Sequence, residues 1–273
     1  MLAAGSCNPV RAGDRSYWNG SPPCGRLPGM PHSPASIHHS LRLVHDERTR
    51  RAATPGLAER VQAVKAYQQR RFAHTYADML ASPRYRPASQ FFLGELYGPG
   101  DFHVRDQQFA RVVPALTRIF PQDVVRTVAM LAQLHGLSEQ LDSAMGEALD
   151  SEPVSALAYG AAWQATGQHS KRTEQIALTV QVAGSLDLIT QRRWIRGSLR
   201  LMRSAAQAAG LGKLQTFLEA GFDAFKAMNG AAEFIAAIEE REQRLAAALF
   251  DAKVKPSRAG GLPQDVLALL PPE

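Results

Sequence analysis

The sequence predicts an all-α fold, a single multi-helix bundle domain with disordered N- and C-terminal tails. Between Thr54 and residue 250, apolar residues recur at intervals of three and four positions, the period of an α-helix buried on one face. No segment alternates apolar and polar residues over the length of a β-strand. The chain has 273 residues, of which 45% are hydrophobic, and this is enough to bury a sizeable core.

The first 53 residues have no helical or strand period and contain six prolines among glycine, serine and arginine. This composition is typical of a disordered tail, which we expect over residues 1–53. Both cysteines, Cys7 and Cys24, lie in this segment. The predicted helical domain, residues 54–250, therefore contains no thiol for a disulfide, a zinc site or a nucleophile.

The first predicted helix begins at Thr54, whose hydroxyl is suited to an N-cap, and continues with Pro55 at the first helical position. It should end before Pro83, because proline removes a backbone donor. A second helix starts near Pro87 and carries a group of aromatic residues. The sequence Gly98-Pro99-Gly100 should end it.

A third helix follows, with Asp101 well placed as its cap. Pro114 lies within its apolar pattern and should kink or restart it. Pro121 opens a fourth helix, and Pro153 begins a fifth that Gly167 ends.

Four helices complete the predicted domain. Ser170 caps a long one, residues 191–209 and 213–228 form the next two, and the last follows the stop at Asn229-Gly230. Residues 251–273 form a Pro/Gly-rich C-terminal tail, in which the apolar run Val266-Leu267-Ala268-Leu269-Leu270 could dock as one short turn.

The formal net charge of +6 comes mostly from the N-terminal segment. Residues 1–60 hold eight arginines and four acids, so the rest of the chain is close to neutral. A dedicated DNA-binding domain has a broader basic surface, which disfavours nucleic acid as a partner. The sequence has no run of 18 apolar residues and no secretory signal, so we expect a cytoplasmic protein without a membrane partner.

The segment from Arg84 to Arg111 surrounds the Gly-Pro-Gly turn with aromatic and charged residues, and it includes Phe91-Phe92-Leu93-Gly94-Glu95-Leu96-Tyr97. This heptapeptide resembles the Phe-Phe-Leu-Glu-Glu-Leu-Tyr (FFLEELY) motif of a bacterial family of uncharacterised helical proteins whose function is unassigned. The resemblance assigns no role to any residue. Gly94 stands where the family motif has its first Glu. This argues that a carboxylate at this position is not essential.

Charged residues beside aromatic rings are costly to bury unless they pair. The charged residues of this segment therefore either form ion pairs that pin the turn to the bundle, which we favour, or line a pocket. The candidates, together with the motif tyrosine, are Arg84, Glu95, Tyr97, Asp101, Arg105, Asp106 and Arg111.

A metal centre is a second candidate site, because carboxylates and histidines one turn apart can converge on iron or manganese inside a helical bundle. His135, Glu139 and Asp142 share one helical face. The pattern is incomplete, since no Glu-x-x-His pair occurs. A haem site with Phe91 or Phe92 ahead of His135 is a weaker variant, and we predict no cofactor.

An anion-binding stripe is the third candidate. Arg192, Arg196, Arg200 and Arg203 share a helical face, and no acid occurs between Leu188 and Leu218. Guanidinium groups form good forks for carboxylate or phosphate. We favour the alternative that acids of neighbouring helices neutralise the stripe. If these pairs are buried, breaking them should cost roughly 1–3 kcal/mol of stability.

No residue pattern completes a catalytic set, so the sequence leaves the function unknown. It favours a non-enzymatic interaction or regulatory protein, with a protein partner or a second copy as its ligand. The alternatives are a metal-dependent or haem-binding oxidoreductase that uses His135, Glu139 and Glu95, and a protein that binds anions or nucleic acid through the arginine stripe.

Overall fold

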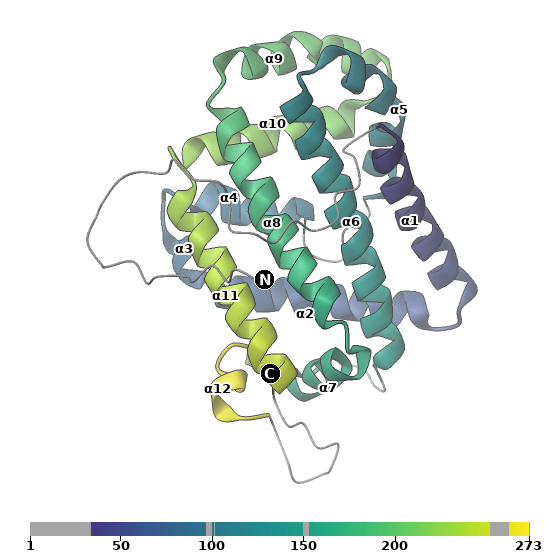
Figure 1. Ribbon diagram of the computed structural model, residues 1–273, viewed down its shortest axis with the longest axis vertical. Coiled ribbons are helices and arrows are strands. Elements are labelled where there is room, and N and C mark those ends of the chain that lie inside the picture. The colour runs from purple at the N-terminus through teal and green to yellow at the C-terminus, as the bar shows by residue number, and fades with distance from the viewer. Residues whose placement is uncertain (1–33, 97–99, 101, 150–152, 252–261, 273) are drawn as a thin grey trace, which may run out of the picture. The chain divides into compact units, whose positions relative to one another are not determined.

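The computed structural model describes residues 34–96, 100, 102–149, 153–251 and 262–272, and its helices belong to one unit that begins at Pro31. Every regular element in these ranges is a helix, which confirms the predicted all-α class. Residues 1–33, most of the predicted N-terminal tail, lie outside the described residues. The helices, shown in Figure 1, are α1 (Pro34–Ala53), α2 (Leu57–Thr75), α3 (Ala77–Ala81), α4 (Arg86–Phe91), a π-helical turn η1 (Phe92–Leu96), α5 (His103–Ile119), α6 (Gln122–Ala148), α7 (Ala156–Thr166), α8 (His169–Thr190), α9 (Arg193–Ala208), α10 (Gly212–Ala227), α11 (Ala232–Asp251) and α12 (Gln264–Leu267).

Helix α1 corrects the predicted extent of the N-terminal tail, because residues 34–53 are helical rather than irregular. The buried side chains of α1 include Ile37 and Val44, but also Ser40 and Arg51. Polar residues on the buried face interrupt the apolar period by which an amphipathic helix is recognised.

The predicted start of the next helix is also wrong. Helix α2 begins at Leu57, after Gly56 in the left-handed conformation at φ 70°. The Thr54 hydroxyl donates to the carbonyl oxygen of Arg50 at 2.9 Å, so it belongs to the end of α1 and does not cap α2. Helix α5 runs through Pro114 as one element, without a restart.

Helix α6 is the central element and contacts α1, α2, α7 and α8 (Figure 1). Two glycines allow the closest approaches. A Cβ on Gly136 would lie 3.2 Å from the Ser40 carbonyl oxygen of α1, and a Cβ on Gly146 would lie 2.6 Å from Val61 Cγ2 of α2. A larger residue at either position would push its partner helix away, so these glycines set the distances of α1 and α2 from α6.

The FFLEELY-like segment contributes to the core. Phe92 lies in a buried cluster with Phe72, Phe225 and Phe234, with ring centroids 5.8–6.2 Å from its own. Phe91 packs against Phe217 at 5.4 Å. Phe91 and Phe92 therefore join α2, α10 and α11.

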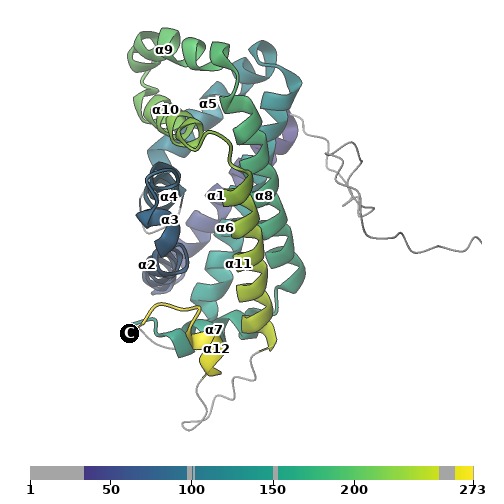
Figure 2. The same ribbon diagram turned by 90° about the vertical axis from the view of Figure 1, so that its left-hand side faces the viewer.

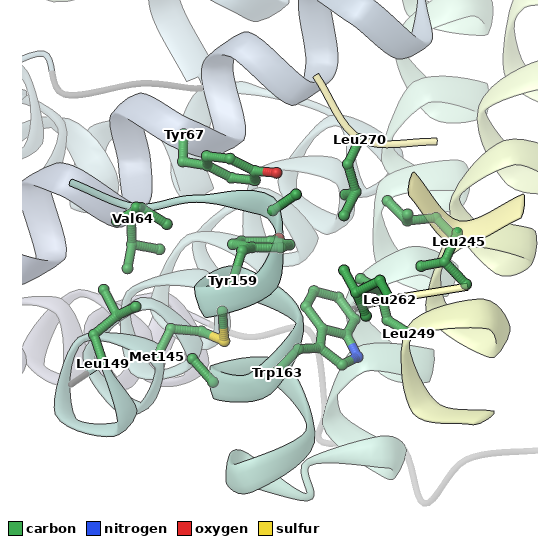
Figure 3. Close-up of a cluster of buried hydrophobic side chains, with 14 residues drawn as sticks. Val64, Tyr67, Met145, Leu149, Tyr159, Trp163, Leu245, Leu249, Leu262 and Leu270 are labelled. Atoms are coloured by element: carbon green, nitrogen blue, oxygen red, sulfur yellow. The ribbon is translucent and has the colours of Figure 1, made fainter. Parts of the chain in front are cut away.

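The C-terminal residues pack against the bundle, so the chain after residue 250 is not a tail throughout. Leu262, Val266 and Leu270 are buried in a cluster with Tyr159 and Trp163 of α7 (Figure 3). The predicted docking turn is found as α12, over Gln264–Leu267. Residues 252–261 lie outside the described residues.

Candidate functional site

The carboxylate of Glu139, on α6, is at the centre of a buried group of charges that we call the Glu139 network. Its side chain is 3% exposed. Arg51 of α1 donates to one carboxylate oxygen and to the Glu139 backbone carbonyl. Lys65 of α2 donates to the other oxygen at 2.9 Å. The network consists of Arg48, Arg51, Lys65, Asp106, His135, Glu139 and Asp142.

Arg48 of α1 links this centre to helix α5. Its guanidinium donates to Asp106 Oδ2 at 2.7 Å and lies 3.7 Å from Glu139 Oε1. His135 Nε2 is 2.9 Å from the same Asp106 oxygen, and Arg105 Nε is 3.5 Å from Asp106 Oδ1. The network therefore ties α1, α2 and α5 to α6.

The pKa values of the two central carboxyls are low. Burial opposes the ionisation of Glu139, but the charges of Lys65, Arg51 and His135 outweigh it and lower the pKa to about 2. Burial likewise opposes the ionisation of Asp106, and the hydrogen bond from His135, with the positive charges around it, lowers that pKa to about 2. Both carboxylates are thus ionised at neutral pH and bound by cations.

Asp142 differs, because burial raises its pKa above the ordinary value despite the nearby charge of Lys65. Lys65 Nζ is 3.8 Å from Asp142 Oδ2, and Gln68 donates to Oδ1 at 3.1 Å. The three predicted metal ligands thus lie in one network, but their polar atoms contact arginine, lysine, glutamine and another carboxylate. In the described residues, no group of three or more His, Cys, Asp or Glu side chains is arranged to hold a metal ion.

Arg48, Arg51 and Lys65 were missed as site residues by sequence reasoning. The two arginines fell in the segment expected to be disordered, and Lys65 lies on the polar side of the apolar pattern of α2. A signal existed for Arg51, since it lies 14 residues after Ile37 and therefore on the same helical face. It was not usable before α1 itself was recognised.

The other charged residues of the Arg84–Arg111 segment form separate contacts. Arg84 donates to the backbone carbonyls of Met228 and Gly230 and to Glu233, and so holds the turn between α10 and α11. Arg111 donates to the Ala209 carbonyl at 3.1 Å. Arg84 therefore pairs with an acid, whereas the hydrogen bond of Arg111 is to a backbone carbonyl.

Arg105 is mostly buried and lies 4.2 and 4.5 Å from the ring centroids of Phe102 and Phe217. It donates to the backbone carbonyl of Glu95 at 2.7 Å, whereas the Glu95 carboxylate is 3.9 Å away. The two remaining candidates, Tyr97 and Asp101, lie outside the described residues.

The arginine stripe is largely neutralised, as favoured. Arg192 pairs with Asp123 of α6 at 2.5 Å, and Arg196 pairs with Asp223 of α10 at 2.6 Å. Arg203 makes two hydrogen bonds to Glu219. Arg200 is exposed and forms no ion pair with an acid in the part of the chain that the structure describes.

Helix α9 also exposes large apolar side chains. Leu201 is 86% exposed, Trp194 48% and Met202 45%. The helix lies at one end of the bundle and packs mainly on α10, burying only Ile195 and Ala206 (Figure 2). We define the α9 face as Arg193, Trp194, Arg200, Leu201 and Met202.

None of the helices in the described ranges has the length and apolar character needed to cross a membrane. No curated protein and no solved structure matches this chain. A family model described as "Domain of unknown function (DUF8198)" matches residues 47–256 and so covers α2 to α11 with the end of α1. All residues of the Glu139 network and of the α9 face therefore lie within the family region, and the chain is a member of the DUF8198 family.

Proposed function

We propose that this protein is a non-enzymatic interaction protein that binds an acidic protein partner on the α9 face. The observation that carries the proposal is that Leu201, which lies between two arginines, is 86% exposed. The helix that carries it buries only Ile195 and Ala206. Single exposed leucines are common on protein surfaces, so the argument depends on what surrounds this one.

The apolar residues of the α9 face are arranged in register. Trp194 and Leu201 are seven residues apart, which places them two turns apart on the same side of the helix. Met202 extends this strip towards the buried side. Covering a tryptophan and a leucine removes enough apolar surface to contribute about 1.5–3 kcal/mol per side chain. Tryptophan is also enriched among the residues that dominate binding energy at protein interfaces.

The charge of the α9 face favours an acidic partner. Arg193 and Arg200 each precede one of the apolar residues, and both are exposed without an ion pair among the described residues. No acid occurs between Leu188 and Leu218 to balance them. Docking of a second copy through the same face would bring arginines together, which disfavours a symmetric dimer.

The chemistry of the Glu139 network supports a binding protein more than an enzyme. A general acid or base needs a pKa near the working pH, whereas Glu139 and Asp106 have pKa values of about 2 and are held by cations. Their arrangement favours a structural role. The FFLEELY-like segment also supports this assignment, since Phe91 and Phe92 are core residues.

The test uses a photo-crosslinking residue at position 201 in cells of the source organism, with the same residue at position 157 as control. Leu157 is an apolar residue of α7 that is 42% exposed, so it matches Leu201 in type but not in charge environment. We expect an acidic protein to be linked from position 201 and not from position 157.

The captured protein is then purified, and its affinity is measured directly. Leu201→Asp should weaken binding at least about tenfold, the equivalent of about 1.4 kcal/mol, whereas Leu157→Asp should leave it unchanged. Binding should also weaken as salt increases. Equal binding by the two variants would contradict the proposal. The proposal would also be contradicted if no protein partner binds and Leu201→Asp instead abolishes self-association or binding to anionic phosphatidylglycerol vesicles.

A further inference from the structure

The exposed side of helix α9 carries two small residues besides those of the α9 face. Ile195 and Ala206, the buried residues of α9, lie on one side of the helix. An α-helix turns by about 100° per residue, so the opposite side is centred on Gly197 and Ser204. Both are exposed and seven positions apart, and they therefore lie along one line on the outer surface. We call this line the α9 midline.

Larger residues of the α9 face form a ridge on each side of the midline. Trp194 and Leu201, which are seven residues apart, form an apolar ridge on one side. Arg193 and Arg200 have the same spacing and form a basic ridge on the other side. All four side chains are exposed. The outer surface of α9 therefore has one apolar edge and one basic edge, with small residues between them.

Neither the backbone nor the packing of this chain requires glycine at position 197. Gly197 lies inside α9 and is not among the described residues with a positive φ. A Cβ built on it would have no atom within 4 Å beyond those of its own turns of helix. Glycine in a helix interior is less favourable than alanine, because it loses more backbone entropy on folding. Gly197 thus weakens α9 slightly and leaves its backbone open to close approach from outside.

The seven-residue spacing favours a helix over an extended strand as the element that covers this surface. Ridges of side chains on one helix pack between the ridges of another, at interaxial distances of about 8–10 Å. Seven residues of α9 span about 10.5 Å, which corresponds to seven residues of a partner helix and so to the same helical face. The same length corresponds to about three residues of a strand, whose side chains then point to opposite faces.

We propose that the acidic partner occupies the α9 face with an amphipathic α-helix, which packs along the α9 midline. The apolar side of this helix lies against Trp194 and Leu201. Its acidic residues, seven positions apart, face Arg193 and Arg200. This inference rests on the proposed function and adds to it the secondary structure of the partner and the register of its contacts.

The first experiment maps the contacts on the protein captured from position 201. A photo-crosslinking residue is placed at position 194 or at position 201 of the full chain, and mass spectrometry identifies the linked residues of the captured protein. A partner helix gives links about seven residues apart, whereas an extended segment gives links about three residues apart. We expect the spacing of seven. Links about three residues apart, or links to two unrelated segments, would overturn the inference.

The second experiment compares Gly197→Ala with Gly184→Ala, a matched control. Gly184 lies inside α8, and a Cβ there would likewise have no atom within 4 Å beyond its own turns of helix. Both variants should raise the melting temperature by about 2 °C, because alanine favours the helix. Only Gly197→Ala should weaken binding of the captured protein, at least about fivefold, since its methyl group lies on the line of closest approach.

The outcomes separate the helical partner from the docking surface itself. Wild-type affinity in Gly197→Ala, together with loss of binding in Leu201→Asp, would overturn the helical partner and leave the docking surface in place. Equal losses of affinity in Gly197→Ala and Gly184→Ala would also overturn it, because close approach at α9 would then not explain the loss. Failure to capture any protein from position 201 would contradict both the docking surface and its helical partner.

Discussion

The Glu139 network and the α9 face are both rich in arginine, but they differ in what surrounds the charge. In the network, Arg51 and Lys65 meet a carboxylate that is 3% exposed and belongs to another helix. On the α9 face, Arg193 and Arg200 lie beside exposed apolar side chains and have no acid partner in the described residues. The first arrangement is complete within the chain, whereas we propose that the second is completed by a partner.

This difference indicates which charges maintain the fold and which are available for binding. Removing one member of a buried pair leaves an uncompensated charge and costs several kcal/mol, but removing an exposed arginine without a partner costs almost nothing. Stability and binding should therefore respond to different mutations. Four measurements test this separation.

The largest effect is expected from Glu139→Gln, which leaves Arg51 and Lys65 buried without their carboxylate. We expect the free energy of unfolding to fall by about 3–5 kcal/mol, and the melting temperature by roughly 10 °C. Denaturation in urea measures the change. Glu240→Gln is the matched control, because Glu240 is exposed on α11, and it should change stability by less than about 0.5 kcal/mol. Similar losses in both variants would show that the network has no special role.

A fall in pH should break the ion pairs of the Glu139 network before it affects the α9 face. The folded pKa values of Glu139 and Asp106, both about 2, lie below their unfolded values of 4.5 and 3.8. A lowered carboxyl pKa contributes stability that is present above the unfolded pKa and is lost as the pH falls towards the folded pKa. These two groups should each contribute about 2–3 kcal/mol at neutral pH and lose it between pH 4.5 and 2.

Asp106→Asn isolates one of these groups, whereas Asp142 acts in the opposite direction because its pKa is raised. Urea unfolding between pH 2 and 6 should show a shallower fall of stability in Asp106→Asn than in the wild type, by up to about 1.4 kcal/mol per pH unit. Parallel curves would mean that Asp106 has the same pKa in both states.

A smaller effect is expected on α9 itself, where paired and unpaired arginines can be compared directly. Arg196 pairs with Asp223, which is 52% exposed, so Arg196→Gln should cost at most about 1 kcal/mol. This is less than the roughly 1–3 kcal/mol that the sequence analysis expected for a buried pair, because the Asp223 carboxylate is partly solvated. Arg200→Gln should leave the melting temperature unchanged but weaken partner binding. A larger stability loss in Arg200→Gln than in Arg196→Gln would contradict the assignment of the two side chains.

The sequence was sufficient to predict the all-α class and most of the later helices. The proposed stops at Gly167 and Asn229-Gly230 are real, since these residues have positive φ values. The apolar period of α11 is also real, with Phe234, Ile238 and Leu245 buried. Such features are local, and each is determined by a few neighbouring residues.

The Glu139 network could not be predicted in the same way, because it depends on contacts between distant segments. Arg51 is 88 residues from Glu139, and Arg48 is 58 residues from Asp106. His135 and Glu139 were recognised as neighbours on a helix, but their partners lie on other helices, Asp106 on α5 and Arg51 on α1 among them. The polar buried residues of α1 concealed its helical period. The neutralisation of the arginine stripe by acids of neighbouring helices could be anticipated, because that prediction needed only the sign of the charges.

The most direct test compares stability and binding in two variants, Glu139→Gln and Leu201→Asp, at a temperature where both are folded. The partner captured from position 201 provides the binding measurement, and thermal unfolding provides the stability. We predict that Leu201→Asp keeps the wild-type melting temperature and loses partner affinity at least about tenfold. Glu139→Gln should melt roughly 10 °C lower and bind the partner with wild-type affinity. Loss of binding in folded Glu139→Gln, or wild-type binding in Leu201→Asp, would contradict the separation of fold and docking surface.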